Sequence, residues 1–177
     1  AAVERLPARG ETVTVPALVA ESGVSRSTFY ALFGDIDTLA VSILSDAFAA
    51  IESEDLQMRS SETPHLAAPV AISRLVAEFA RNRALIAGAL SSRASASALR
   101  AIETSFAAQA LGTITVTAPA HIDPEFAADH LAGGTIAVLT RWVLADDPAP
   151  AAHVQQQLLA LLPNWLPKAV NSRGAVS

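Results

Sequence analysis

Hydrogen-bonding side chains gather in one short stretch of this largely apolar chain. The candidates for donating to phosphates or base edges there are Ser25, Arg26, Ser27, Thr28 and Tyr30. Thr14 and Ser25 also stand where helices can begin, and the free N–H groups at a helix start favour a phosphate. These residue types and their spacing predict a surface that contacts double-stranded DNA.

Two short helices are expected to position these side chains. The first covers residues 16–22 and ends at Gly23, and the second covers residues 26–33. Such a pair has the dimensions of a helix-turn-helix, in which the second helix enters the major groove. A small core is expected from Leu18, Val24, Phe29 and Phe33. The spacing alone also allows a plain helical hairpin within a larger bundle.

The stretch carries a wider set of residues: Val13-Thr14-Val15, Leu18, Gly23-Val24-Ser25, Phe29-Tyr30, Phe33 and Leu39. This set resembles the DNA-binding signature of the tetracycline-repressor (TetR) family of bacterial transcription regulators. The resemblance covers about residues 10–45. It implies a helix-turn-helix DNA-binding domain over residues 1–45, with a truncated first helix, and a helical ligand-binding and dimerisation domain over residues 46–177. It further implies a homodimeric repressor that a small apolar or amphipathic effector releases from a palindromic operator.

The rest of the chain is expected to be helical as well. Ala supplies 38 of the 177 residues, which favours helix because Ala loses no side-chain entropy there. Apolar spacing predicts a long helix over residues 36–54, followed by a loop over residues 57–69. Further helices are expected around residues 72–79, 85–90, 99–111, 124–145 and 150–162. The expected fold is therefore all-α, an N-terminal three-helix unit followed by a helical bundle.

The charge distribution keeps a second function open. The chain carries 12 basic and 17 acidic residues, a net charge of −5. Residues 1–45 hold three Arg against five Asp and Glu, a net charge of −2. The family commonly has a Lys near the start of its fourth helix, where this chain has Ile36. Because an acidic segment loses attraction for phosphates, the alternative is an all-α small-molecule-binding protein that no longer binds DNA.

A ligand pocket is expected among the middle helices of the second domain. Its predicted apolar lining is Phe48, Phe79, Leu90, Phe106 and Trp142. The polar candidates are Arg74, Gln109, His130 and Arg141, since pockets use a few polar groups among apolar walls to orient a ligand. Each of these side chains has an ordinary core or surface role as its alternative.

The last two helices are the expected dimer interface. Gly133 and Gly134 lie in the middle of the helix over residues 124–145, where a glycine costs helix stability. A close helix crossing would justify them, and a two-fold four-helix interface with residues 150–162 follows. Close packing within one chain is the alternative explanation.

Other function classes lack their motifs. The chain has no nucleophile elbow and no phosphate-binding glycine loop, so we expect no enzyme activity. Its four His residues are scattered, which predicts neither a metal site nor a cofactor. No stretch reads as a membrane span, and the absence of Cys fits a cytoplasmic location.

Overall fold

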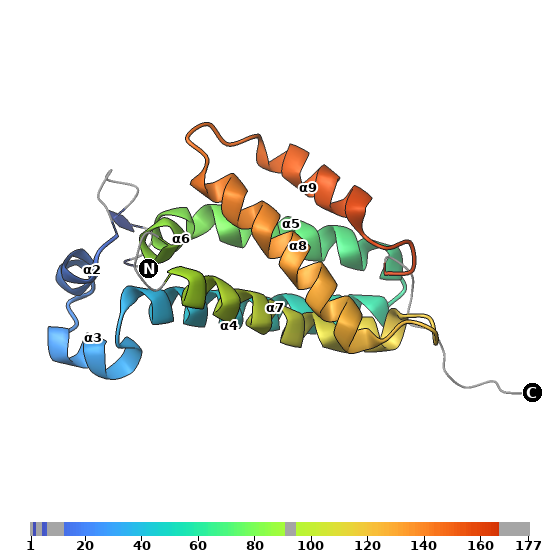
Figure 1. Cartoon of the computed structure of the whole chain (residues 1–177), viewed down its shortest axis with the longest axis horizontal. Helices are drawn as coiled ribbons and strands as arrows, with labels where there is room; N and C mark the ends of the chain where they lie inside the picture. Colours follow the sequence, from blue (N-terminus) through green and yellow to red (C-terminus); the bar gives the residue numbers. More distant parts are fainter. Residues whose placement is uncertain (1, 3–4, 7–12, 91–94, 167–177) are drawn as a thin grey trace, which may run out of the picture.

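The computed structural model describes residues 2, 5–6, 13–90 and 95–166, and this part of the chain confirms the all-α prediction. No strand occurs within it. Figure 1 shows α2 and α3 at one end of an elongated molecule, with the remaining helices forming a bundle. The helices are α2 (Val15–Ser22), α3 (Arg26–Phe33), α4 (Ile36–Arg59), α5 (Ala67–Arg81), α6 (Arg83–Leu90), α7 (Ser95–Thr117), α8 (Pro124–Leu144) and α9 (Ala151–Leu161), with a short 3-10 turn at Pro64–Leu66.

The long helix α4 joins the two ends of the molecule. Its 24 residues extend over about 36 Å at 1.5 Å per residue. It begins at Asp35, whose side chain accepts a hydrogen bond from the backbone N–H of Thr38 at 2.7 Å. It packs against α5, α6 and α7. It also continues without a break across residues 45 and 46, where the boundary between the two domains is expected.

Two predicted boundaries are wrong. Residues 55–59 continue α4 beyond the predicted end at residue 54 and into the predicted loop, because Asp55 and Arg59 are buried and paired one turn apart. Residues 67–69 begin α5, and Pro69 fits there because the first turn of a helix needs no donor from it.

Three apolar clusters form the core. The largest lies in the middle of the bundle and includes Phe48, Phe79, Ile136 and Leu139. Another lies between α7, α8 and the turn after α9. The third lies beneath α2 and α3, and here Leu85 and Ala89 of α6 pack with Leu18, Phe29 and Leu39. The helices of the N-terminal end therefore share their core with a helix of the bundle.

Candidate functional site

Local capping signals fix the ends of α2 and α3. The Thr14 side chain caps α2 and accepts from the N–H of Ala17 at 3.4 Å. Gly23 ends that helix with a φ of 70°, a conformation that glycine adopts without strain. Ser25 then caps α3 and accepts from the N–H of Thr28 at 3.1 Å. The two helices are thus joined by a tight turn, at the positions that the sequence predicts.

The six side chains predicted to contact DNA are all exposed. Thr14 lies at the start of α2, whereas Ser25, Arg26, Ser27 and Thr28 surround the start of α3. The Ser25 hydroxyl lies 2.8 Å from the hydroxyls of both Ser27 and Thr28, so hydroxyl groups cluster at this end.

The buried side of the helix pair explains why these groups face outward. Phe29 is only 5% exposed and contacts Tyr30 edge to face, while Tyr30 itself is 54% exposed. Leu18 is buried and Phe33 is half-buried. Val24 was predicted in this core, but it is 37% exposed because the turn between Gly23 and Ser25 directs it to solvent.

Arg26 is the cation of this exposed surface. It makes no ion pair within the described part of the chain. Arg5, by contrast, donates to the side chain of Glu21 on α2. The positive charge at the start of α3 is therefore available to a partner.

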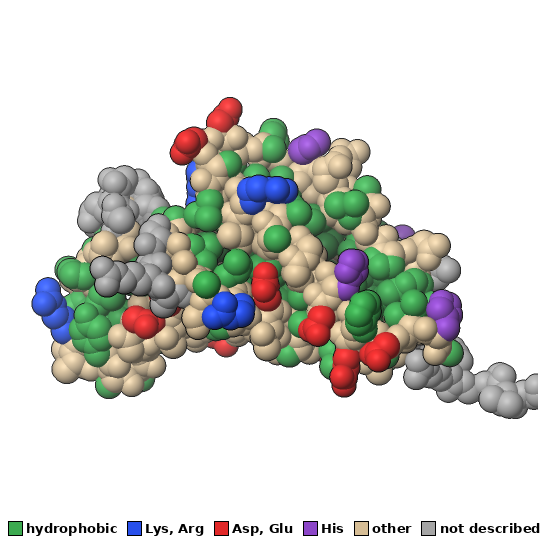
Figure 2. Space-filling model, in the orientation of Figure 1, with side chains coloured by type: hydrophobic (Ala, Val, Ile, Leu, Met, Phe, Trp, Pro, Cys, Tyr) green, Lys and Arg blue, Asp and Glu red, His purple; other side chains and the backbone are tan. Residues whose placement is uncertain are grey.

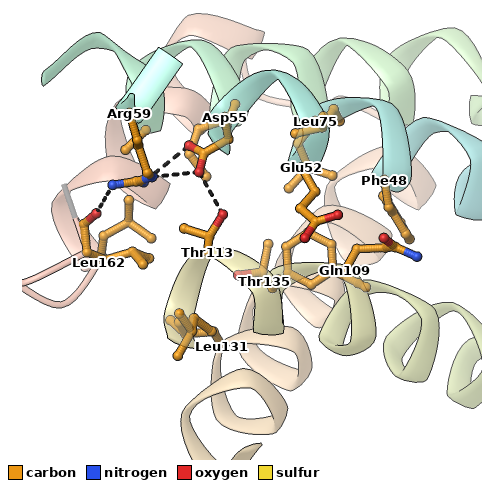
Figure 3. A pocket seen from close by; sticks show the side chains of 18 residues that line it. Phe48, Glu52, Asp55, Arg59, Leu75, Gln109, Thr113, Leu131, Thr135 and Leu162 are labelled. Atoms are coloured by element: carbon orange, nitrogen blue, oxygen red, sulfur yellow. Dashed lines mark hydrogen bonds and ion pairs between the residues drawn. The ribbon is translucent and has the colours of Figure 1, made fainter. Parts of the chain in front are cut away.

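A cavity opens in the bundle between α4, α5, α7, α8 and the turn after α9 (Figure 3). It encloses about 100 Å³, and its walls are mainly apolar. The lining residues are Phe48, Ile51, Glu52, Asp55, Arg59, Ala68, Ala71, Ile72, Leu75, Phe106, Gln109, Ala110, Thr113, Ile114, Leu131, Thr135, Leu162 and Leu166.

Three of the seven residues predicted to bind the ligand line this cavity, namely Phe48, Phe106 and Gln109. The rings of Phe48 and Phe106 meet edge to face, with centroids 5.2 Å apart. Phe79 does not line the cavity, because it stacks behind Phe48 and is fully buried in the core.

The other predicted pocket residues do not line this cavity either. Leu90 packs against the central core, and His130 is exposed on α8. Trp142 packs on the same core and donates its indole N–H to the carbonyl of Ala149 at 2.8 Å, which holds the loop between α8 and α9. Of the further polar candidates, Arg74 pairs with Glu54 and Arg141 is exposed on α8.

A buried polar group at one end of the cavity was not predicted from the sequence. Arg59 donates to the Asp55 carboxylate at 2.6 Å and to the carbonyl of Leu166 at 2.7 Å. Thr113 of α7 donates to the same carboxylate at 2.7 Å (Figure 3). This group joins α4, α7 and the turn after α9. Only the i, i+4 spacing of Asp55 and Arg59 could have suggested it.

A second carboxylate of α4, that of Glu52, also lines the cavity, about one helical turn before Asp55. Glu52 is half-buried and reaches from α4 toward the level of Thr135 and Gln109 (Figure 3). An ideal Cβ on Gly112 of α7 would lie 2.0 Å from a Glu52 carboxylate oxygen. The missing side chain of Gly112 therefore makes the space that this carboxylate occupies.

The outer face of α8 meets no partner among the described residues. A Cβ on Gly133 or Gly134 would meet none of their atoms within 4 Å, so close packing within this part of the chain does not explain these glycines. Phe126 on the same helix is 76% exposed, and Leu161 on α9 is 72% exposed. Figure 2 shows hydrophobic side chains reaching the surface across the face that α8 crosses, with a few charged and His side chains among them.

The described residues contain neither a membrane-spanning helix nor a cluster of metal-ligating side chains. No helix among them combines the length and the apolar character that crossing a membrane requires. No group of three or more His, Asp or Glu side chains among them is placed to hold a metal ion.

Comparison with known proteins identifies no family for this chain. No protein-family model, no curated protein and no solved structure matches this chain.

Proposed function

We propose that this protein is a ligand-responsive, DNA-binding transcriptional regulator, most simply a repressor that acts as a homodimer. The observation that carries the proposal is the exposed polar surface at the start of α3. There Arg26, which has no ion-pair partner among the described residues, and three hydroxyl groups face solvent above a buried Phe29. Arg and Ser or Thr side chains are suited to base edges and phosphates in a major groove.

The dimer supplies the second recognition helix. Two α3 helices would enter successive major grooves roughly 34–36 Å apart on a near-palindromic operator. The exposed glycines and apolar side chains of α8 and α9 support a two-fold interface there, because missing Cβ atoms let two helices approach closely.

The path from the cavity to the recognition helices runs through α4 and α6. Phe48 and Glu52 of α4 line the cavity, while Leu39 of the same helix packs beneath α2 and α3. On α6, an ideal Cβ at Gly88 would lie 3.2 Å from both the Ile36 side chain and the Val13 carbonyl. A ligand that binds one pose of α4 more tightly therefore shifts the equilibrium toward that pose, by the difference between its affinities for the two poses. The separation of the two recognition helices changes with the pose.

A selection experiment tests the proposal. The full-length chain is incubated with a random-sequence duplex library at low salt, and bound duplexes are enriched, sequenced and retested by fluorescence anisotropy. We expect enrichment of a near-palindrome whose half-sites lie about one helical turn apart. Retention that does not depend on sequence would contradict the proposal.

The second candidate function is a small-molecule-binding protein without DNA affinity. The acidity of the N-terminal region favours it, since residues 1–45 carry a net charge of −2 and phosphate attraction dominates duplex affinity. Ligand binding together with a failed selection would place this candidate first.

A further inference from the structure

We propose that the bundle cavity takes a compact organic cation, an ammonium group on an apolar body, with the Glu52 carboxylate as its counter-charge. This assignment deepens the proposed function, because it names the chemical class of the effector.

The charges on the cavity wall do not balance. Its charged lining residues are Glu52, Asp55 and Arg59. Asp55 and Arg59 neutralise each other at 2.6 Å, and Thr113 also donates to Asp55. The remaining charge is the single negative charge of Glu52.

Glu52 has no partner for that charge in the described part of the chain. Arg74 on the neighbouring helix α5 pairs with Glu54 instead, at 2.7 Å. A half-buried carboxylate loses part of its hydration, and only an opposite charge or hydrogen-bond donors replace it. The cavity therefore favours a cation over a neutral molecule and disfavours an anion.

The other walls suit the body of such a ligand. The rings of Phe48 and Phe106 line the cavity, and aromatic faces attract cations as well as apolar groups. Gln109 and Thr135 also line it, and neither side chain makes a hydrogen bond among the described residues. Their oxygen atoms can accept N–H groups that the carboxylate leaves unused.

The size of the space limits the ligand. A cavity of about 100 Å³ admits at most a single ring or a short branched chain. Gly112 is part of this arrangement, because a larger residue there would displace the Glu52 carboxylate.

Three ligands that share a phenyl ring and differ in charge test the inference: benzylammonium, benzyl alcohol and benzoate, measured by isothermal titration calorimetry on the full chain without DNA. We expect benzylammonium to bind about tenfold more tightly than benzyl alcohol, and benzoate to bind least. In the variant Glu52→Gln, benzylammonium should lose this advantage while benzyl alcohol is unchanged. Glu62→Gln, at an exposed position outside the cavity, is the matched control and should keep the preference.

Each outcome decides the inference separately from the proposed function. Equal binding of benzylammonium and benzyl alcohol, no binding of benzylammonium, or a preference that survives Glu52→Gln would overturn it, whatever the chain does with DNA. A cation preference that depends on Glu52 would support it even if the selection for an operator fails, and the chain would then be a cation-binding protein of the second candidate class.

Discussion

The carboxylate of Asp55 and the guanidinium of Arg59 lie 2.6 Å apart, one helical turn from each other, and their side chains are only 5% and 1% exposed. The pair stands at the end of α4, where it also holds Thr113 and the carbonyl of Leu166. A buried pair of this kind contributes little beyond a well-packed apolar pair, but removing one partner leaves a buried charge uncompensated.

Replacing Asp55 should therefore destabilise the protein strongly. We expect Asp55→Ala to lower the free energy of unfolding by about 3–5 kcal/mol, because Arg59 would keep its charge in the core. Urea denaturation followed by circular dichroism measures this. Asp46→Ala removes an exposed Asp from the same helix and should change the value by less than about 0.5 kcal/mol. Similar losses in the two variants would show that the buried pair has no special role.

Removing Arg26 should weaken DNA binding without disturbing the fold. We expect Arg26→Ala to lose about 1–3 kcal/mol of affinity for the selected operator, with its melting temperature unchanged, since the side chain is exposed and unpaired. Fluorescence anisotropy and a thermal melt measure the two quantities. Arg100→Ala removes the same charge from the exposed surface of α7 and is the control. If Arg26→Ala unfolds the chain, its role is structural.

Filling the open face of α8 should separate the subunits. Gly133→Leu is compatible with the packing of the described residues, because none of their atoms lies within 4 Å of the new Cβ, but it blocks a close approach of a second helix. Multi-angle light scattering should show a dimer for the parent chain and a monomer for the variant. Ala77→Leu adds the same side chain at an exposed position of α5 and should leave the mass unchanged. A dimeric Gly133→Leu variant would remove α8 from the interface.

Gly112→Ala should stabilise the helix and weaken ligand binding together. Ala is favoured over Gly in a helix interior by about 0.8–1 kcal/mol, while the new Cβ takes the place of a Glu52 carboxylate oxygen. We expect weaker binding of benzylammonium and unchanged binding of benzyl alcohol, measured by calorimetry alongside a denaturation curve. Unchanged binding of both would mean that Glu52 acts equally well from another rotamer.

The Asp35 cap should give stability that depends on pH. The hydrogen bond from the Thr38 N–H to the Asp35 carboxylate lowers the pKa of this group below its usual value of 3.8. A lowered pKa in the folded state means that the stabilisation is present above the unfolded pKa and disappears as the pH falls through the folded one.

Asp35→Asn keeps a capping oxygen but not the charge. Its stability relative to the parent should therefore improve as the pH is lowered from 5 to about 3, measured by urea denaturation. A constant difference over this range would contradict the role of the charge.

The sequence predicted the features whose causes are local. Thr14, Gly23 and Ser25 specify the ends of α2 and α3 by their own side chains and backbone preferences, so these ends agree with the structure. The end of α4 could not be predicted in the same way. The helix continues there because Asp55 and Arg59 bond to α7 and to the turn after α9, and these contacts are not visible in the local sequence.

The cavity was predictable only in part for a related reason. Phe48, Phe79 and Phe106 share the same helical apolar spacing, yet Phe79 lies behind Phe48 and does not reach the cavity. Which of several apolar side chains faces a space depends on how the helices are rotated against one another. Glu52 likewise looks like an ordinary surface residue until Gly112 is placed opposite it.

The packing of Leu85 and Ala89 against Leu18 and Phe29 limits how this molecule can be divided. A chimera that joins residues 1–45 to a foreign bundle would expose the apolar side of α2 and α3 to water, because it lacks the α6 residues that cover this side. A chimera joined within α4 would be destabilised for the same reason. If the proposed regulator binds an operator, its specificity should therefore be changed more easily by substitutions on the outer side of α3 than by replacing the whole N-terminal segment.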